Sequence, residues 1–455
     1  MSPNNARIIR LHFLFLLGTL WTWQHPASAV HAGNDDSFPV GNQAAIVAGA
    51  VAATVSDGSA TYYNPAGLGA VTRSGVDVSA SGYVLRHYQA ARFLQTPDGA
   101  TKDASVTEFV AVPTQVAYVR RLTPGVSLGL GYYVPRAGDV VLRERVISSE
   151  GARSSSAALD LRVSDATYVL GAAVGARVAP TWRLGVGLYA IYENQIESAA
   201  IFGATMQDAV SQSATHFGVL GTYTRVATEP RLGVQWDVSP EITLALSAAG
   251  PRLQVLRSGE ESVSLSVTDL SAAPDRQLMT FSEREPSRGE SLGVSALGRY
   301  ALAMAYHVGS SIVRAELDVQ PGYTSARTQV DRRSTWNVRA GWTWRVAEST
   351  SVGLGVFSDR GTNRDRGDAS GASRTDFYGA SAGIELSDIL KLLDVERADS
   401  LILSTVFAVR YAYGRGFEGG LRLGAGDDLE SLVEPVRSTL TVHELNLHVG
   451  SALYF

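Results

Sequence analysis

The chain has 455 residues, a formal net charge of −5 and a hydrophobic fraction of 45%, an average that resembles a soluble protein. It has no cysteine, which excludes disulfides and a lipid-modified N-terminal cysteine. Beyond residue 29 no run is apolar for long enough to predict a transmembrane helix. No surface combining basic and aromatic residues is indicated, so we expect no nucleic-acid partner.

Residues 1–29 predict a secretory signal peptide. Arg7 and Arg10 supply the positive start, and Leu11 to Trp23 is an apolar run too short to span a bilayer comfortably as a helix. Ala27-Ser28-Ala29 has the small-x-small pattern of a cleavage site. We therefore expect an exported protein and exclude residues 1–29 from the fold.

Residues 30–72 lack a strand pattern and predict a hatch, or plug, inside a barrel. Ala44 to Val55 suits a short helix, and Asn64-Pro65-Ala66-Gly67 is turn chemistry. Pro65 disfavours a helical backbone at Asn64, whose amide could then bond to nearby backbone or to wall charges such as Arg339 or Glu316. The alternative is that this stretch merely turns the chain into the first strand.

From residue 73 to 455 the chain repeats a period-two alternation of apolar and polar residues. Residues 336–346 place tryptophan, valine and alanine on one face and polar residues or glycine on the other. The pattern predicts an all-β fold, a transmembrane antiparallel β-barrel of about fourteen strands. Strands are expected to begin near Val76, Val106, Val126, Ala157, Trp182, Phe217, Glu241, Glu290, Ser310, Ser334, Ser351, Thr375, Leu401 and Arg437.

The connections predict the topology of this barrel. Proline turns at 123–125 and 179–181 suit the periplasmic side, and the polar segments 136–156 and 270–290 suit external loops. An even strand number then leaves both termini in the periplasm. One periplasmic connection, 387–399, reads as a short amphipathic helix.

Tryptophan placement agrees with such a barrel. Trp182, Trp236 and Trp344 fall near proposed periplasmic turns, and Trp336 falls at the opposite end of its strand, as interfacial girdles require. Arginine outnumbers lysine so strongly that only two lysines occur. This preference suits bidentate contact with lipopolysaccharide phosphates, or it reflects genome composition.

The chain ends on Phe455, inside its last alternating strand. A terminal aromatic resembles the signal read by the outer-membrane assembly machinery. The sequence therefore predicts three partners, namely that machinery, outer-membrane lipid with lipopolysaccharide, and a hydrophobic small-molecule ligand. We expect a monomer in the outer membrane of a Gram-negative bacterium.

Several enzyme-like strings do not carry chemistry. Gly379–Gly383 matches G-x-S-x-G but sits in an alternating strand without the strand-to-helix turn that the motif needs. His443 and His448 have the wrong spacing for a zinc helix and would face opposite sides of a strand. Asp359, Asn363, Asp365 and Asp368 lack the full ligand spacing of a calcium loop. We expect no catalytic residue, no metal and no cofactor.

Gly49 to Leu68, with Asp57, Ser59 and the run Asn64-Pro65-Ala66-Gly67-Leu68, resembles the N-terminal hatch of the FadL/TodX family of outer-membrane transporters. The resemblance implies a fourteen-stranded barrel whose lumen is closed by the hatch. It also implies that hydrophobic molecules pass through a lateral opening in the barrel wall. The start departs from that family, because Phe38 follows a polar stretch.

Three functions are compatible with this pattern. The favoured one is passive uptake of hydrophobic small molecules, of the long-chain fatty acid or aromatic hydrocarbon class. The alternative is a hatch-bearing barrel that acts as a structural or secretion-system component. A barrel-embedded lipid hydrolase is weakest, since no Ser/His/acid set lies in adjacent strands. The arginine-rich loops weigh against fatty acid as the ligand.

Overall fold

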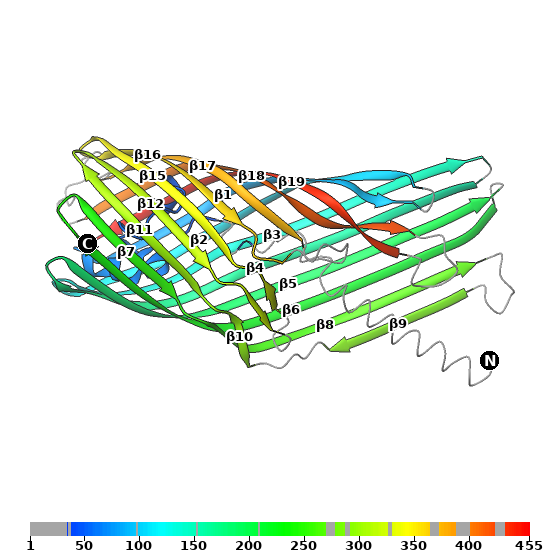
Figure 1. Ribbon diagram of the computed structural model, residues 1–455, viewed down its shortest axis with the longest axis horizontal. Coiled ribbons are helices and arrows are strands. Elements are labelled where there is room, and N and C mark those ends of the chain that lie inside the picture. The colour runs from blue at the N-terminus through cyan, green and yellow to red at the C-terminus, as the bar shows by residue number, and fades with distance from the viewer. Residues whose placement is uncertain are drawn as a thin grey trace.

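The computed structural model describes residues 34, 38–96, 99–151, 153–207, 210–269, 278–286, 292–325, 330–364, 373–387, 401–423 and 433–455. These residues form mainly long β-strands arranged as an elongated barrel (Figure 1). The predicted signal peptide lies outside the described residues, as does nearly all of the helix expected over 387–399.

Most strands of the wall begin within a few residues of a predicted position, but those that begin at Arg252, Leu278 and Arg299 were not predicted. Three short helical elements precede them: α2 (Asn42–Ile46), α3 (Ala60–Tyr63) and the 3-10 helix η3 (Pro65–Ala70). The strands are β1 (Gly75–Gln95), β2 (Thr101–Thr123), β3 (Val126–Glu150), β4 (Arg153–Ala179), β5 (Trp182–Gln207), β6 (Val210–Asp237), β7 (Ile242–Ala249), β8 (Arg252–Asp269), β9 (Leu278–Pro286), β10 (Gly293–Ala296), β11 (Arg299–Val308), β12 (Ser311–Gln320), β13 (Tyr323–Ser325), β14 (Val330–Arg332), β15 (Thr335–Ala347), β16 (Thr350–Arg360), β17 (Arg374–Leu386), β18 (Ile402–Leu423) and β19 (Val433–Tyr454).

Antiparallel pairing between neighbours in sequence closes the sheet into a barrel, because β1 pairs with both β2 and β19. Two wall positions are interrupted. β7 and β8 pair in series with two parts of β6, and β10 and β11 pair in turn with β8 and β7. The number of strands depends on how these pieces are counted, so the value of about fourteen stays a prediction.

The alternation predicted from sequence sets the two faces of the wall. On β12 the apolar side chains of Val313 and Leu317 point outward, while Arg314, Glu316 and Asp318 are buried inside. A belt of exposed apolar residues therefore surrounds a polar lumen, as an outer-membrane barrel requires. No helix within the described ranges is long and apolar enough to cross a membrane.

The predicted girdles are present on this belt. At one end Trp182 and Trp236 are cross-strand partners whose rings stack 5.1 Å apart. Higher on the same wall Tyr168 lies between Tyr132 and Tyr192, with ring centroids about 6 Å from each. Along β5, Trp182 and Tyr192 are separated by about ten residues, roughly 33 Å of strand, which suits a tilted membrane crossing.

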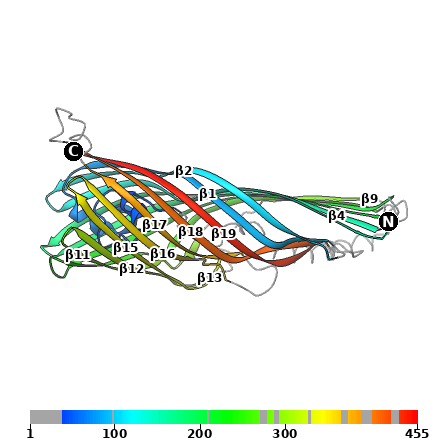
Figure 2. The same cartoon turned by 90° about the horizontal axis from the view of Figure 1, so that it is seen from above.

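The strands continue far beyond this belt. β4, β5 and β6 have 27, 26 and 28 residues, whereas a crossing strand needs about 9–11. The expectation of a polar external loop over 136–156 is therefore wrong, since β3 and β4 pair through almost all of it. We call the extension the wing and define it as residues 136–150, 153–167, 193–207, 210–228 and 252–269 (Figure 2).

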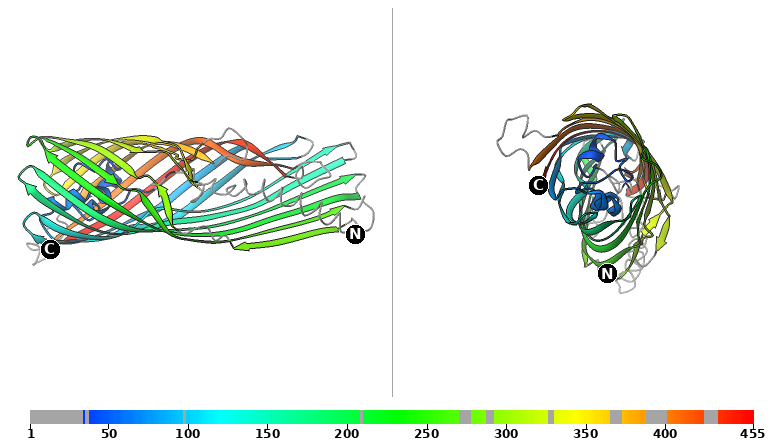
Figure 3. Two further views of the ribbon diagram at one scale, coloured as in Figure 1. Left: turned by 60° about the horizontal axis from the view of Figure 1, so that its bottom comes forward. Right: turned by 90° about the vertical axis from the view of Figure 1, so that its left-hand side faces the viewer.

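Residues 38–71, here called the lumenal segment, lie inside the barrel. Viewed along the barrel, α2, α3 and η3 occupy the space enclosed by the strands (Figure 3). They sit toward the end of the barrel at which β1 begins and β19 ends. The segment is buried almost throughout, so it forms part of the lumen's inner packing at this end of the barrel.

Candidate functional site

Asn64 organises the turn of the lumenal segment. Its backbone is extended, with φ −155° and ψ 102°, as the following proline predicts. Its side-chain Oδ1 accepts a hydrogen bond from the Ala66 N–H at 3.1 Å, which caps η3. Its Nδ2 donates to the carbonyl oxygens of Ala52 at 2.8 Å and of Val234 in β6 at 3.3 Å. The fully buried amide thus joins two parts of the segment to the wall.

Glu316, one of the two wall charges proposed as partners for Asn64, binds the backbone of Ala52. Glu316 accepts a hydrogen bond from the Ala52 N–H at 3.1 Å and pairs with Arg339 at 3.0 Å. The Ala52 carbonyl accepts from Asn64 and from Gln235 Nε2, the latter at 3.0 Å. The Ala52 backbone is therefore held on both sides, once from within the segment and twice from the wall.

Directly opposed glycines make room for the Asn64-Pro65 turn. Gly175, Gly185 and Gly233 are cross-strand neighbours in β4, β5 and β6. A Cβ added to either of the first two would overlap Pro65, and one on Gly233 would overlap the Asn64 side chain. The wall backbone thus forms a flat bed for the motif, with Leu68 seated beside Gly129 of β3.

A second glycine bed holds α2. A Cβ on Gly353 or Gly383 would crowd Ile46, and one on Gly355 would overlap Val47. Ser381 donates its hydroxyl to the Ile46 carbonyl at 2.7 Å. Ser381 and Gly383 of the G-x-S-x-G string therefore seat α2, whereas Gly379 makes room for the ring of Phe357.

Donors from the wall also reach the carbonyls around α3. The Tyr133 hydroxyl donates to Gly58 O at 3.2 Å, and Ser247 donates to Tyr63 O at 2.6 Å. Arg231 donates to the Tyr62 carbonyl, and its guanidinium lies 4.6 Å from the Tyr62 ring centroid. Because a buried carbonyl without a donor is costly, these contacts stabilise the segment in one position.

Two buried carboxyl groups meet at the start of α3. Asp57 accepts hydrogen bonds from the N–H of Ser59 at 2.9 Å and from its hydroxyl at 2.5 Å. Asp77 of β1 accepts from the Gly58 N–H. Burial raises the pKa of Asp57, which belongs to the lumenal segment and not to a spanning strand. Protonation of Asp57 therefore favours the docked position.

A layer of buried ion pairs lies beyond the tip of the segment. Arg86 pairs with Glu444 at 2.6 Å and with Glu108 at 3.3 Å, and Arg410 pairs with the same Glu444. The Arg86 guanidinium lies 5.2 Å from the ring centroid of Phe38, the first residue of the segment. The layer is charge-paired, so the lumen here is polar although it carries little excess charge.

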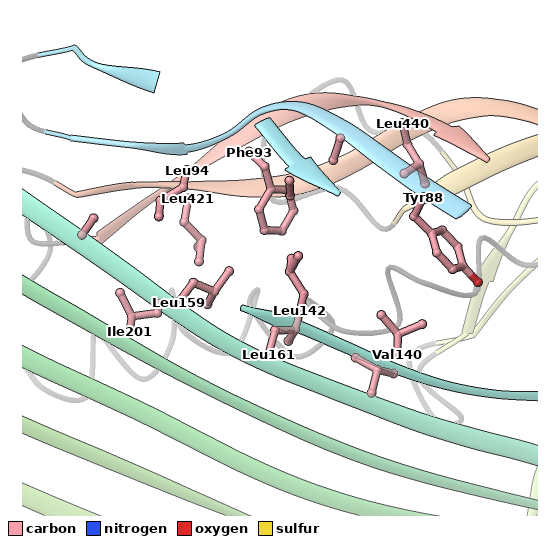
Figure 4. Packing of buried hydrophobic residues seen from close by; sticks show 14 of the residues in the cluster. Tyr88, Phe93, Leu94, Val140, Leu142, Leu159, Leu161, Ile201, Leu421 and Leu440 are labelled. Atoms are coloured by element: carbon pink, nitrogen blue, oxygen red, sulfur yellow. The ribbon is translucent and has the colours of Figure 1, made fainter. Parts of the chain in front are cut away.

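Above this layer the inner wall becomes apolar. Inward side chains from the wing strands β3, β4 and β5 and from the neighbouring parts of β1, β18 and β19 point toward one another (Figure 4). We call this cluster the apolar interior; it consists of Tyr88, Ala90, Phe93, Leu94, Ala104, Val140, Leu142, Val146, Ala157, Leu159, Leu161, Val163, Ile201, Phe217, Leu421, Leu440 and Val442. It contains more buried residues than any other apolar cluster within the described residues, and it differs from the charged lumen next to the segment.

The lumen beside the segment has the opposite character. A cavity of about 90 Å³ lies against Tyr62 and Tyr63, and ten of the residues that line it are charged. Glu229 pairs there with Arg231 at 2.9 Å and with Arg252 at 3.3 Å. Such a cavity suits water or a polar group better than an apolar molecule.

The other residues singled out in the sequence are dispersed. Phe455 is half-exposed, and its N–H donates to Ser74 O at 2.9 Å beside the start of β1. His443 contacts Tyr411 on the outer face, whereas His448 faces Asn42 inside. Of the four residues weighed for calcium, Asp365 and Asp368 lie outside the described residues.

Sequence reasoning missed the apolar interior. Leu142 occurs where a polar loop was expected, because charged neighbours such as Arg143 and Arg145 dominate the local composition. The alternation of Val140 and Leu142 with outward residues was the available signal. The wall residues that donate hydrogen bonds to carbonyls of the lumenal segment form no recognisable pattern in the local sequence.

The fold resembles solved transport channels. A FadL homologue from Pseudomonas aeruginosa is 12% identical, with a TM-score of 0.60 over 92% of this chain and 99% of that one. The toluene transporters TodX of Pseudomonas putida and TbuX of Ralstonia pickettii are each 11% identical, with TM-scores of 0.54 and 0.52. TodX aligns over 88% of this chain and 95% of its own, TbuX over 92% and 99%.

One curated sequence is also similar. A Neisseria meningitidis serogroup B protein named as an outer membrane protein is 32% identical over 127 residues, which is 27% of this chain and 26% of that protein. The match thus spans about a quarter of the relative's length. No family model matches the chain. Together the findings confirm the resemblance to FadL/TodX barrels at the level of fold, and they place the protein in the outer membrane of a Gram-negative bacterium.

Proposed function

We propose that this outer-membrane barrel, with the fold of the FadL and toluene transporters, mediates passive uptake of hydrophobic small molecules and that residues 30–72 act as its hatch. The observation that carries the proposal is the apolar interior of the wing, which lies above a lumen filled by the lumenal segment. The named activities of TodX and TbuX, toluene transport, agree with it.

The physical reason for such a route is the lipopolysaccharide layer, which is polar and excludes apolar solutes. A small hydrocarbon that buries about 150 Å² among side chains such as Leu142, Leu159 and Leu421 gains roughly 4 kcal/mol from leaving water, before the cost of ordering it. This is enough to concentrate a solute transiently and too little to trap it. Weak reversible binding is what passive uptake needs.

The charge layer bears on the substrate class. Arg86 and Arg410 are already paired with Glu444, and Arg86 also with Glu108. An uncharged apolar compound can occupy the apolar interior without disturbing these pairs, whereas a carboxylate would compete with Glu444. The arrangement favours the aromatic hydrocarbon class over long-chain fatty acids.

The hatch role rests on how the segment is held. Its turn is seated on Gly175, Gly185 and Gly233, and its carbonyls receive donors from several wall strands. A barrel of this width without a filled lumen would leave a water channel. We infer that the segment closes that channel to polar solutes.

A charge placed in the apolar interior tests the proposal. Leu142→Asp and Leu159→Asp should lower uptake of radiolabelled toluene by cells at least tenfold, while heat-modifiable mobility on gels shows that the barrel still assembles. Val141→Asp is the matched control, because Val141 is the outward neighbour of Leu142 on β3. Equal uptake by wild type and both inward variants would refute the transport proposal.

The wing supports a second candidate. Strands of 26–28 residues carry the wall well beyond a membrane crossing, which a barrel serving as a structural or secretion-system component would also use. In that case the Leu142 and Leu159 variants would leave uptake unchanged, and truncation of the wing would abolish assembly with a partner.

A further inference from the structure

The outward face of the wing carries a composite row of side chains. Arg145, Ala158, Phe202, His216 and Ser266 are direct cross-strand neighbours in β3, β4, β5, β6 and β8. Adjacent residues such as Val146, Ala157, Ile201 and Phe217 belong to the apolar interior, so the row lies on the opposite, outer face. It crosses the whole width of the wing.

A hollow lined in part by two stacked aromatic rings lies at the centre of this row. The rings of Phe202 and His216 stack with centroids 4.5 Å apart and an interplanar angle of 21°. Small residues beside them, including Ala158 and Ala204, leave a hollow of about 370 Å³. Its rim carries the hydroxyl groups of Ser156, Ser266 and Thr268 and the guanidinium of Arg145.

Arg145 differs from the other outward arginines of β3 and β4. Arg143 pairs with Asp160 at 3.0 Å, and Arg162 pairs with Asp139 at 3.2 Å. Within the part of the chain that the structure describes, Arg145 has no ion pair and is exposed. A flat aromatic surface, several hydroxyls and one uncommitted guanidinium are the groups that bind a sugar carrying a phosphate.

We propose that this hollow binds the phosphorylated core oligosaccharide of lipopolysaccharide in the surrounding leaflet. Sugar rings would lie on Phe202 and His216, and a phosphate would bind Arg145. The site is separate from the apolar interior and does not depend on what the barrel transports. It would fix the wing against the saccharide layer.

The height of the hollow selects the core sugars over lipid A. Phe202 follows Tyr192 by about ten residues on β5, which is roughly 33 Å along the strand and about 25 Å along the membrane normal at the usual tilt. Lipid A phosphates lie at the girdle itself. The hollow therefore lies at the level of the core oligosaccharide, outside the apolar belt.

Fluorescence anisotropy with labelled core oligosaccharide, freed of lipid A, measures this directly on the intact barrel in detergent. Wild type should bind the phosphorylated core, and removal of the phosphates should weaken binding. Phe202→Ala and Arg145→Gln should each raise the Kd about tenfold or more, as expected for losing one stacking platform or one charged contact. Arg162→Gln and Phe109→Ala, which alter an outward arginine and an outward aromatic elsewhere, should leave the Kd unchanged.

Heat-modifiable mobility of each variant confirms assembly, so that lost binding is not lost folding. The proposal fails if wild type does not bind the core, if dephosphorylated core binds equally well, or if the two control variants lose as much affinity as the site variants. It also fails if lipid A vesicles, and not the core, bind with the same sensitivity to Phe202 and Arg145.

Discussion

The side-chain amide of Asn64 donates to the backbone carbonyl of Ala52 at 2.8 Å and thereby closes a twelve-residue loop inside the barrel. The same amide contacts β6, so one residue joins the fold of the lumenal segment to its position in the wall. Loss of this contact should therefore release the segment without dismantling the barrel.

Asn64→Ala, alone or with Pro65→Ala, should leave the barrel assembled and destabilise the docked segment by about 1–3 kcal/mol, because buried carbonyls lose their donor. Planar-bilayer conductance and entry of small polar antibiotics should both rise. Gln89→Ala, on an exposed side chain of β1, is the control. Unchanged conductance of an assembled Asn64 variant would argue against a hatch role.

A side chain added to the glycine bed should have a similar effect by a different cause. Gly185→Val forces a clash with Pro65 and should displace the turn, which raises conductance and exposes the segment to protease. Val186→Leu, at the exposed outward neighbour on β5, should do neither. A Gly185→Val barrel that stays closed and protease-resistant would mean that the segment does not rest on this bed.

Docking of the segment should depend on pH through Asp57. Burial raises its pKa above the ordinary value of 3.8, so the protonated form is favoured when docked. The stabilisation is complete below pH 3.8 and is lost as pH rises through the raised pKa.

Single-channel recordings across this range should show fewer openings at acidic pH. Asp57→Asn, which keeps the shape without the charge, should abolish the pH dependence contributed by this residue. Openings that become more frequent on acidification would reverse the predicted sign.

The topology can be read with single cysteines, since the chain has none of its own. Asp139→Cys on the exposed wing should react with an impermeant maleimide on intact cells, and Thr181→Cys at the β4–β5 turn should react only after lysis. Because outer-membrane barrels have short turns on the periplasmic side and longer connections outside, the short β4–β5 turn beside the Trp182–Trp236 girdle is expected on the periplasmic side. The opposite labelling result, with Thr181→Cys reacting on intact cells and Asp139→Cys reacting only after lysis, would mean that the barrel has the reverse orientation.

Phe455 is expected to serve assembly. Its exposed ring ends the chain next to β1, so Phe455→Asp puts a charge on the lipid face and alters the terminal signal. In the Phe455→Asp variant, the amount of heat-modifiable barrel in outer-membrane fractions should fall severalfold. The Phe455→Tyr variant should assemble nearly normally. Full assembly of the Phe455→Asp variant would show that Phe455 is not part of the assembly signal.

The sequence by itself determined which residues face lipid and where most strands begin. Period-two alternation places Val313 and Leu317 outward and Arg314 inward without reference to any neighbour, because successive side chains of a strand point to opposite faces. It also determined the extended backbone of Asn64, since the following proline acts only on adjacent atoms.

Only the tertiary structure decided which distant residues meet. The row Gly175, Gly185 and Gly233 depends on the register of three strands, and the link from Glu316 to Ala52 joins residues 264 positions apart. The sequence did not predict the apolar interior for the same reason. Its members are separated by charged outward residues in sequence and become contiguous only when the wing strands pair and place one side chain from each strand beside the next.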